Sequence, residues 1–443
     1  MANHFSDLPS VDAVLRDPGI ALLPRAFALR ATREVLAELR QAIHDKVSAP
    51  LPHVPELVGV RVRAWQRGQL RRVINATGIA LHTNLGRAPW ASAAIDAVKR
   101  VAEGYCNLEI DLHSGERGGR GDGAVQWLLE LTGAEAAMVV NNCSAAVLLA
   151  LTSLAQGREV LVSRGELVEI GGGFRVPEVI TACGARLIEV GTTNRTRIRD
   201  FEAALGSDAA VLLRVHPSNF RVVGFTEAPS RPELVALARA SGLYTVEDVG
   251  SGSFDGAYGE PSVCEAVGDG VDLVIFSGDK LLGGPQSGIL VGRSEAVARL
   301  RRHPLYRALR VDKVVLAALE ATLCLRAAGE LSPVERMLHA SDAELRLRAD
   351  RLAEALRERG VPAEVRPTEA YAGGGTLPGL GRPSHGVFVR THRTDSVVRA
   401  LRTGDPAVLP RVEKGAMVFD VLALLDTEVA EVASRVASLL ALR

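Results

Sequence analysis

Lysine is rare in this chain, and one lysine stands where its amine could act as a nucleophile. The sequence contains only five, namely Lys46, Lys99, Lys280, Lys313 and Lys414. Lys280 follows the apolar run 271–276 and lies among glycines in the segment 276–288. Arginine could not replace it, because a guanidinium stays protonated and offers no free amine. A lysine at the end of a buried strand, among glycines, suits a Schiff base to pyridoxal phosphate.

Other polar groups follow two more predicted strands. Asp248 falls at the end of the run 243–249, where a buried carboxylate could keep the cofactor's ring nitrogen protonated and make the ring an electron sink. Ser277, just before Lys280, could add a hydroxyl. Free N–H groups and the helix dipole could hold a phosphate where the predicted helix 145–154 begins, after Asn141, Asn142, Cys143 and Ser144.

Each of these residues also has an ordinary structural interpretation. Asp248 precedes a glycine-rich segment and could be a turn residue. Asn142 could be a simple N-cap, and Lys280 could be a surface lysine with an extended side chain. Their joint occurrence, in the right order at strand ends, favours a pyridoxal phosphate site over a purely structural role.

Arg87, Arg307 and Arg310 form a second group, because the sequence shows no evident acidic partner for them. Arg87 lies in a glycine-bearing loop, and a helix would place Arg307 and Arg310 on one face. Two guanidinium groups on one face can bind a tetrahedral oxyanion through bidentate hydrogen bonds. The alternative, that these arginines pair with surface carboxylates, stays open on the sequence alone.

Apolar strands alternate with amphipathic helices from Val73 onward. The predicted strands are 136–141, 159–163, 185–190, 210–215, 243–249 and 273–277. Continuous apolar strands separated by helices predict an α/β fold with a mostly parallel sheet covered on both faces. Chemistry in such sheets collects at the carboxyl ends of the strands, which is where Lys280 and Asp248 fall.

The same patterns divide the chain into three predicted domains. Residues 1–72 are predicted to be helical, with Ser10 as an N-cap and a long amphipathic helix over 26–47. Residues 73–310 are predicted to form the large α/β domain. Residues 311–443 alternate helices, the first over 315–328, with strands such as 386–390 and 416–421, which predicts a smaller α+β domain.

Arginines crowd the end of the first domain, at Arg61, Arg63, Arg67, Arg71 and Arg72. Such a run is usually a solvated helical face. The formal net charge of the chain is zero, which neither supports nor excludes nucleic-acid binding, since phosphate contacts need only a local basic patch.

Composition narrows the class of protein further. The five cysteines are scattered, without a CxxC pair or metal-ligand spacing, so we expect reduced thiols, no metal site and a cytoplasmic location. The opening residues do not resemble a signal peptide, and no apolar run approaches the roughly 20 residues that span a bilayer.

The chain resembles the bacterial selenocysteine synthases, the L-seryl-tRNA(Sec) selenium transferases, along nearly its whole length. The matching segments are 8–12, 75–78, 83–89, 107–109, 163–170, 191–194, 216–220, 276–288 and 307–323. This resemblance implies a fold-type I pyridoxal phosphate enzyme with a seven-stranded type of central sheet, a tRNA-binding N-terminal domain and a homo-oligomeric ring of dimers, a decamer. Neither DNA nor a membrane is an expected partner.

Carried over position by position, the resemblance assigns Lys280 to the Schiff-base lysine and Asp248 to the ring-nitrogen partner. It assigns Arg87, Arg307 and Arg310 to the phosphate of the selenium donor, selenophosphate. The implied reaction converts L-seryl-tRNA(Sec) to L-selenocysteinyl-tRNA(Sec) through an aminoacrylyl intermediate, with Lys280 moving the proton at Cα.

The sequence departs from the family pattern at two places. Asn141-Asn142-Cys143-Ser144 stands where the family usually has Asn-Asn-Asn-Ala, a change that backbone contacts to phosphate would survive. Phe419-Asp420-Val421-Leu422 stands where the family commonly has Leu-Asp-Leu-Arg, so an arginine is absent at Leu422.

Two other functions are compatible with parts of the sequence. A lyase of the same fold, releasing ammonia from a small phosphorylated amino acid, would use Lys280 identically but has no use for residues 1–72. A tRNA-binding protein without catalysis is disfavoured by the intact Lys280 and Asp248.

Overall fold

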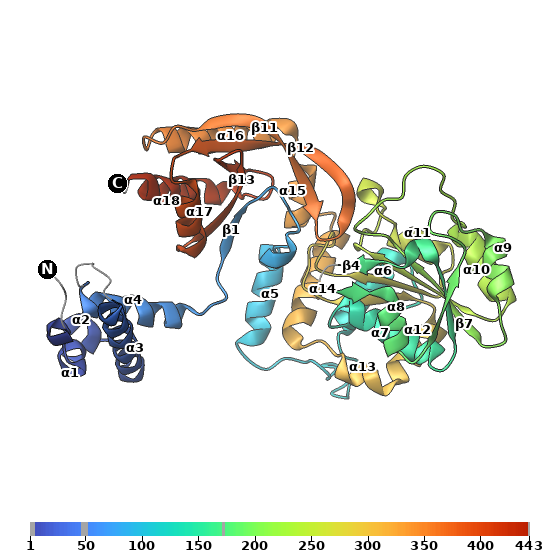
Figure 1. The fold of residues 1–443 in the computed structure, drawn as a ribbon. Coiled ribbons are helices and arrows are strands. Elements are labelled where there is room, and N and C mark those ends of the chain that lie inside the picture. Colours follow the sequence, from blue (N-terminus) through green and yellow to red (C-terminus); the bar gives the residue numbers. More distant parts are fainter. Residues whose placement is uncertain (1–4, 46–51, 171–172, 442–443) are drawn as a thin grey trace. The chain divides into compact units, whose positions relative to one another are not determined.

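The structure, a computed structural model, describes residues 5–45, 52–170 and 173–441, which form two compact units, Met1–Val73 and Ile74–Arg443. The first unit is helical, as predicted (Figure 1). Its helices are η1 (Phe5–Asp7), α1 (Val11–Leu15), α2 (Pro18–Ala21), α3 (Arg25–His44) and α4 (Val54–Arg67). The predicted helix 26–47 corresponds to α3, and its last two residues lie outside the described ranges.

The helices of the first unit pack through an apolar seam and one strong ion pair. Ser10 is the predicted N-cap of α1, since its hydroxyl accepts a hydrogen bond from the Ala13 N–H at 3.2 Å. Buried alanine, valine and leucine side chains of α3 and α4 form a separate small core. Arg61 of α4 binds Glu38 of α3 through two hydrogen bonds of 2.7 and 2.8 Å, which fixes the two helices relative to each other.

A seven-stranded sheet forms the centre of the second unit, with the strand order β2-β10-β9-β8-β7-β3-β6. The strands are β2 (Ala136–Val140), β3 (Glu159–Ser163), β6 (Arg186–Val190), β7 (Ala209–Val215), β8 (Tyr244–Gly250), β9 (Leu273–Ser277) and β10 (Gly288–Gly292). Neighbouring strands pair in parallel from β9 to β6, whereas β10 runs antiparallel to both β9 and β2. The mostly parallel sheet is therefore confirmed, and β10 is a strand that the sequence analysis missed.

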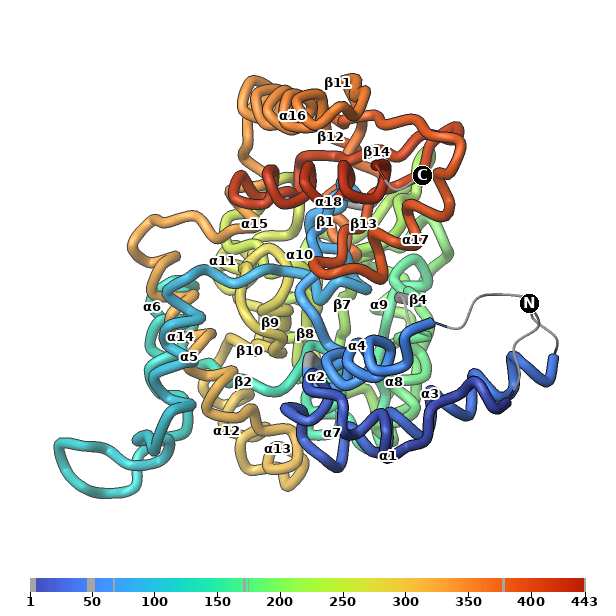
Figure 2. The backbone as a smooth tube through the Cα atoms, turned by 90° about the vertical axis from the view of Figure 1, so that its left-hand side faces the viewer, coloured from blue at the N-terminus to red at the C-terminus, as the bar shows by residue number. Residues whose placement is uncertain are grey.

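Helices cover both faces of this sheet, because side chains of each strand alternate between two apolar cores. Met138 and Val140 of β2 pack with α7, α8 and α12, while Ala137 and Val139 pack with α6, α11 and α14. The helices are α6 (Asp122–Thr132), α7 (Cys143–Ala155), α8 (Val176–Ala182), α9 (Ile198–Ala204), α10 (Arg231–Ala240), α11 (Val263–Gly268), α12 (Ser294–Arg302), α13 (Pro304–Ala308) and α14 (Lys313–Ala327). Helix α5 (Ser92–Ala102) lies beside α14 (Figures 1 and 2).

A five-stranded sheet follows in the order β1-β13-β14-β12-β11. Its strands are β1 (Val73–Ala76), β11 (Glu364–Gly373), β12 (Thr376–Arg390), β13 (Ala407–Glu413) and β14 (Ala416–Asp420), and α15 (Pro333–His339), α16 (Asp342–Arg357), α17 (Thr394–Thr403) and α18 (Val429–Ala441) accompany it. The segment 73–76, which the sequence analysis placed in the large domain, thus adds an edge strand to this sheet. Phe419 and Leu422 are fully buried in its core.

Short elements complete the fold. They are the two-stranded ribbon β4 (Glu169–Ile170) and β5 (Phe174–Arg175), and the short helices η2 (Thr83–Leu85), η3 (Arg164–Glu166), η4 (Ala257–Gly259) and η5 (Asp426–Glu428). The turn between β11 and β12 approaches the large sheet, since a Cβ at Gly375 would lie 3.4 Å from the Ser218 hydroxyl. Among the described residues, no helix is long and apolar enough to cross a membrane.

Candidate active site

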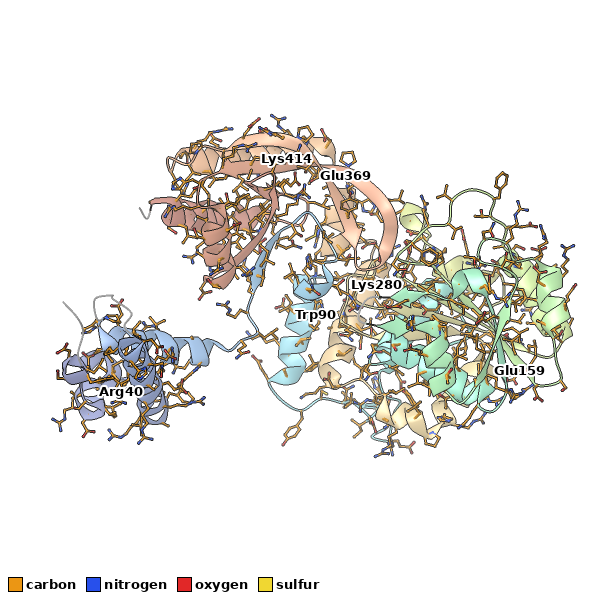
Figure 3. All side chains as sticks on the ribbon, viewed as in Figure 1. Arg40, Trp90, Glu159, Lys280, Glu369 and Lys414 are labelled. Atoms are coloured by element: carbon orange, nitrogen blue, oxygen red, sulfur yellow. The ribbon has the colours of Figure 1, made fainter. Side chains whose placement is uncertain are left out.

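Seven of the nine predicted site residues line one cavity of about 280 Å³ at the carboxyl ends of the central strands. They are Arg87, Asn142, Cys143, Ser144, Asp248, Ser277 and Lys280. Figure 3 labels Lys280 at these strand ends. The parallel sheet explains this convergence, because β7, β8 and β9 end at the same edge.

Lys280 is almost completely buried, with 6% of its surface exposed. The turn after β9 holds its backbone, because Leu281 donates to the Ser251 carbonyl at 3.0 Å and Gly283 donates to the Lys280 carbonyl at 2.9 Å. Gly250, at φ 64°, lies so close that an added Cβ would stand 3.7 Å from the lysine Nζ. Because its amine is buried in a cavity, Lys280 is not a surface lysine with an extended side chain, and the amine can react with a bound molecule.

Asp248, at the end of β8, is the buried carboxylate of the same cavity, with 7% of its surface exposed. Burial raises the pKa of this carboxyl, and the nearby Lys280 ammonium opposes that rise. Its Oδ1 atom accepts hydrogen bonds from the Gly250 N–H at 3.0 Å and the Cys143 thiol at 3.5 Å. Both bonds fall on Oδ1, so Oδ2 can serve another donor, such as a protonated ring nitrogen.

Helix α7 begins at the cavity and offers backbone donors there. The Asn142 side chain caps the helix by accepting from the Ala145 N–H at 2.8 Å, so the simple N-cap interpretation is correct as far as it goes. In the described part of the chain, the N–H groups of Cys143 and Ser144 have no hydrogen-bond acceptor. Two free N–H groups at the start of a 13-residue helix form a site for a phosphate.

Close packing of backbone brings this helix start to the lysine strand. Gly288, the first residue of β10, pairs with Val140 on one side and Ser277 on the other. A Cβ at Gly288 would collide with the Asn142 carbonyl, so only glycine fits at this position.

Burial raises the pKa of the Cys143 thiol well above its ordinary value, which keeps it a neutral S–H donor to Asp248.

Arg87 has an acidic partner that the sequence did not reveal. Its Nη1 atom lies 2.7 Å from Oδ2 of Asp279, the residue just before Lys280. Arg87 adopts φ 61°, a left-handed conformation that non-glycine residues rarely adopt. The ion pair holds the guanidinium at the cavity wall against this backbone preference.

Arg307 and Arg310 do not line the Lys280 cavity. Helix α13 ends at Ala308, so the prediction that one helix carries both arginines is wrong for Arg310. Arg310 lies 3.6 Å from Glu109 and stacks over Tyr306 at 5.5 Å. Arg307 is exposed, and among the described residues no ion pair involves it.

The cavity also contains residues of the segments 216–220 and 276–288 that were not predicted individually as site residues. His216 and Ser218 follow β7, and Asp279 and Gln286 flank the lysine turn. The Ser218 hydroxyl is buried without a hydrogen-bond partner within the described residues, and His216 Nε2 lies 3.5 Å from Glu260. Their position after a predicted strand was the signal that could have identified His216 and Ser218.

Leu422, at the second departure from the family pattern, does not line this cavity. Its side chain is fully buried, and its N–H donates to Asp420 Oδ1 at 3.1 Å. Asp420 is itself bound by the Thr368 and Ser384 hydroxyls at 2.7 and 2.8 Å. This position therefore serves the core of the five-stranded sheet.

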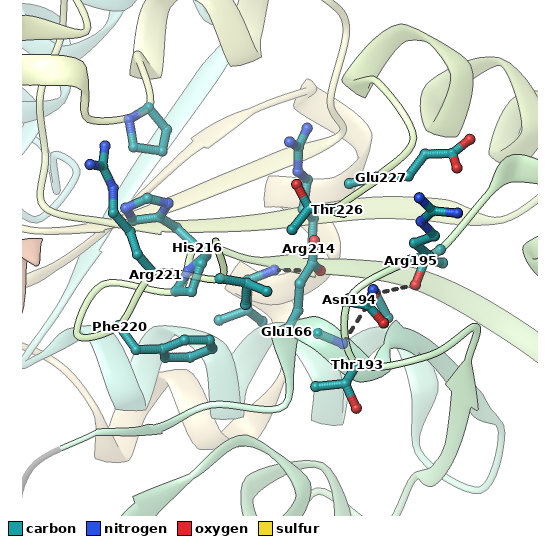
Figure 4. Close-up of a pocket in the computed structure, with 18 of the residues that line it drawn as sticks. Glu166, Thr193, Asn194, Arg195, Arg214, His216, Phe220, Arg221, Thr226 and Glu227 are labelled. Carbon is teal, nitrogen blue, oxygen red and sulfur yellow. Dashed lines mark hydrogen bonds between the residues drawn. The ribbon is translucent and has the colours of Figure 1, made fainter. Parts of the chain in front are cut away.

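A larger pocket of about 470 Å³, drawn in Figure 4, shares Val215 and His216 with the Lys280 cavity. It contains neither Lys280 nor Asp248, so we assign the covalent chemistry to the smaller cavity. In the wall of the larger pocket, burial raises the pKa of Glu166 to about 7 although the Arg214 cation opposes the rise.

The residues around Lys280 fit pyridoxal phosphate in each of its parts. They offer an amine for its carbonyl, a carboxylate for its ring nitrogen and free helix N–H groups for its phosphate. The solved structure of D-glucosaminate-6-phosphate ammonia-lyase has the same fold, with a TM-score of 0.59 at 23% identity over 85% of this chain and 98% of that chain. Fold and site together define a fold-type I, pyridoxal phosphate-dependent enzyme.

Sequence comparison identifies the family within this class. Residues 73–425 match the family described as L-seryl-tRNA selenium transferase, and residues 5–40 match the selenocysteine synthase N-terminal region. The L-seryl-tRNA(Sec) selenium transferase of Moorella thermoacetica is 48% identical over 97% of this chain and 96% of its own length. That of Desulfomicrobium baculatum is 45% identical over the whole of both chains. The chain belongs to the L-seryl-tRNA selenium transferase family.

Proposed function

We propose that this enzyme converts L-seryl-tRNA(Sec) to L-selenocysteinyl-tRNA(Sec) with selenophosphate as selenium donor. The observation that carries the proposal is the buried pair of Lys280 and Asp248 in one cavity, in a chain of this family. The substrate is an aminoacylated tRNA, which is made and used in the cytoplasm, so we place the reaction there.

Each residue of the cavity has a defined task in this reaction. Pyridoxal phosphate, when bound, supplies a carbonyl for the seryl amine and an electron sink for Cα. Lys280 would attach the cofactor and then move the proton at Cα, since its amine is the buried base of the cavity. Asp248 would hold a proton on the ring nitrogen through Oδ2.

The phosphate of the cofactor would bind at the start of α7. The free N–H groups of Cys143 and Ser144 would bind it, with Asn142 fixing the helix start and Ser277 contributing its hydroxyl. These are backbone contacts for the most part, so the side chains that differ from the usual family pattern can still support them.

Arg87 would bind the selenium donor from the cavity wall. Its guanidinium has further N–H groups besides the one that donates to Asp279, and these can reach an oxyanion. Arg307 and Arg310 would take part from a neighbouring copy of the chain, since in their own protomer they lie away from Lys280. This requirement supports a homo-oligomer, for which we propose a decameric ring of dimers.

The first domain, residues 1–72, would bind the body of the tRNA. It is a compact helical unit, and several of its arginines gather near its end. We assign the chemistry to residues 73–310, the large domain, and the support of the cavity to residues 311–443, whose β11–β12 turn reaches Ser218.

The test is incorporation of radiolabelled selenium from selenophosphate into seryl-tRNA(Sec) by the purified protein, with seryl-tRNA(Ser) as the matched control. We expect label in selenocysteine released from the first tRNA only. The rival ammonia-lyase activity is tested in parallel by measuring ammonia released from D-glucosaminate 6-phosphate. Ammonia release without selenium incorporation would refute the proposed function.

A further inference from the structure

The proposed reaction does not yet assign a ligand to the 470 Å³ pocket beside the Lys280 cavity. The carboxyl ends of β3, β6 and β7 and the loop 217–228 form most of its wall (Figure 4). Because Val215 and His216 line both spaces, a molecule in the pocket lies next to whatever occupies the cavity. Any ligand of the pocket is thus a direct neighbour of the reacting group.

The charges at the base of this pocket neutralise one another. Arg231 binds Glu247 at 2.6 Å and also binds Asp269 at 2.8 Å. Arg214 lies 3.9 Å from the same Glu247 carboxylate. A dianion at the bottom of the pocket would meet carboxylates as well as guanidinium groups. The bottom of the pocket therefore favours a polar ligand without charge.

The rim of the pocket differs from its bottom, because the arginines Arg195 and Arg221 at the rim form no ion pairs among the described residues. Both arginines are exposed. Arg195 instead donates to the Phe225 carbonyl at 3.3 Å and lies over the Phe225 ring. Figure 4 shows Arg221 and Arg195 on opposite sides of the pocket. The rim can therefore accept a phosphodiester.

One aromatic side chain stands in the pocket wall with part of its surface open. Phe220 is 37% exposed, and it follows His216 by only a short stretch of loop. An aromatic wall next to rim arginines is the combination that proteins use for a single unpaired base, which stacks on the ring while the cations contact the backbone. Thr193 and Asn194 add polar groups that could meet a base edge.

The chemistry of the substrate connects these features. In an aminoacylated tRNA, a few covalent bonds join the amino acid to the ribose of the 3′-terminal nucleoside. If the seryl amine reaches Lys280, that nucleoside must lie directly beside the Lys280 cavity. We propose that the pocket binds the 3′-terminal nucleoside of seryl-tRNA, with its base against Phe220 and its phosphodiester at the rim that carries Arg195 and Arg221. The proposal rests on the proposed role of Lys280.

Glu166 supports a base in this position. Its carboxylate is part of the pocket wall and accepts a hydrogen bond from the Val215 N–H at 3.1 Å. With a pKa of about 7, this carboxyl is protonated in part of the molecules at neutral pH. It can then donate to a ring nitrogen as well as accept from an exocyclic amine, which suits an adenine edge.

The experiment compares two forms of tRNA(Sec) that differ only in the terminal adenosine. The dissociation constants of the complete tRNA and of the tRNA without this nucleoside are measured for the full-length protein. Stacking on an aromatic side chain predicts that the wild type prefers the complete tRNA by about 5- to 150-fold. Phe220→Ala should lose the part of this preference that comes from stacking, whereas Phe220→Tyr should keep the full preference.

Val223→Ala is the matched control, because Val223 belongs to the same loop, is 89% exposed and does not line the pocket. It should behave as the wild type. An undiminished preference in Phe220→Ala would overturn the proposal. A lower native mass of Phe220→Ala with the preference intact would also overturn it, since Phe220 would then contact a second copy.

Failure of this inference can be distinguished from failure of the proposed function. Wild-type protein that transfers selenium normally, while Phe220→Ala keeps its preference for the terminal adenosine, would remove the pocket assignment alone. Wild-type protein without selenium transfer would instead refute the proposed function, whichever tRNA it prefers.

Discussion

Replacing Arg87 by alanine separates binding of the selenium donor from chemistry at Cα. Arg87 lies at the wall of the Lys280 cavity and pairs with Asp279 at 2.7 Å. In our account the guanidinium binds the donor's phosphate and does not touch the proton at Cα. Arg87→Ala should therefore slow selenium transfer and leave removal of the Cα proton nearly unchanged.

The size of the effect follows from the lost contact. A hydrogen bond to a charged group contributes about 1.5–3 kcal/mol, which corresponds to a roughly ten- to hundredfold slower transfer. The substitution also leaves the Asp279 carboxylate without its partner. The Arg87 side chain is 31% exposed, so we expect about 1–2 kcal/mol of lost stability, between the values for exposed and buried ion pairs.

Two labels measure the two steps in single-turnover experiments. Release of tritium from Cα of the seryl group reports the proton transfer, and incorporation of radiolabelled selenium reports the second step. The double variant Arg87→Ala/Asp279→Ala removes the unpaired carboxylate. It should recover most of the melting temperature while selenium transfer stays slow. Arg346→Ala, which breaks an exposed pair with Asp350, is the control for loss of a surface cation.

Two results would refute this reasoning. Equal slowing of tritium release and selenium incorporation would mean that Arg87 acts before the donor binds. Recovery of selenium transfer in the double variant would mean that the defect comes from the unpaired Asp279 carboxylate, so that Arg87 has a structural role.

Three further predictions concern other parts of the chain. Asp248→Ala should bind pyridoxal phosphate more weakly and lose most of its turnover, because the ring nitrogen loses its proton; absorbance and turnover measure this, and full activity would exclude this carboxylate. Deleting residues 1–72 should greatly weaken tRNA binding in a filter assay and leave the cofactor absorbance intact, whereas unchanged affinity would exclude the tRNA-binding role. The Glu166 carboxyl has its pKa raised from 4.5 to about 7, so the folded protein binds more protons than the unfolded chain between these values. The free energy of unfolding should fall as the pH rises through this window, and Glu166→Gln should reduce this dependence of stability on pH. Melting temperatures measured across the window check this, and the same pH dependence in wild type and Glu166→Gln would contradict the raised pKa.

The central part of the fold was predictable because its strands are continuous apolar runs. The predicted runs that became β3, β7, β8 and β9 lie within one or two residues of their observed bounds. Parallel strands end at one edge, so the meeting of Lys280, Asp248 and the start of α7 also followed from the sequence. Strand β10 was missed, since five residues with glycine at each end carry little periodicity.

The arginines show where sequence reasoning ends. Arg87 and Asp279 are 192 residues apart, and only the folded chain brings them together. Arg310 and Glu109 are likewise far apart in the sequence, so no local pattern could predict their pairing. The spacing of Arg307 and Arg310 suggested one helix face, but His303-Pro304 begins a helix that ends at Ala308. Spacing predicts a shared face only where the helix extends over both residues.

The most direct test of the account replaces Lys280, because every proposed step depends on its amine. Purified wild-type protein and Lys280→Ala are compared for the absorbance of bound pyridoxal phosphate and for selenium incorporation into seryl-tRNA(Sec). Lys99→Ala, which removes an exposed lysine of α5, is the control. We predict that Lys280→Ala loses both signals while Lys99→Ala keeps them. Normal absorbance and selenium incorporation in Lys280→Ala would contradict the central claim.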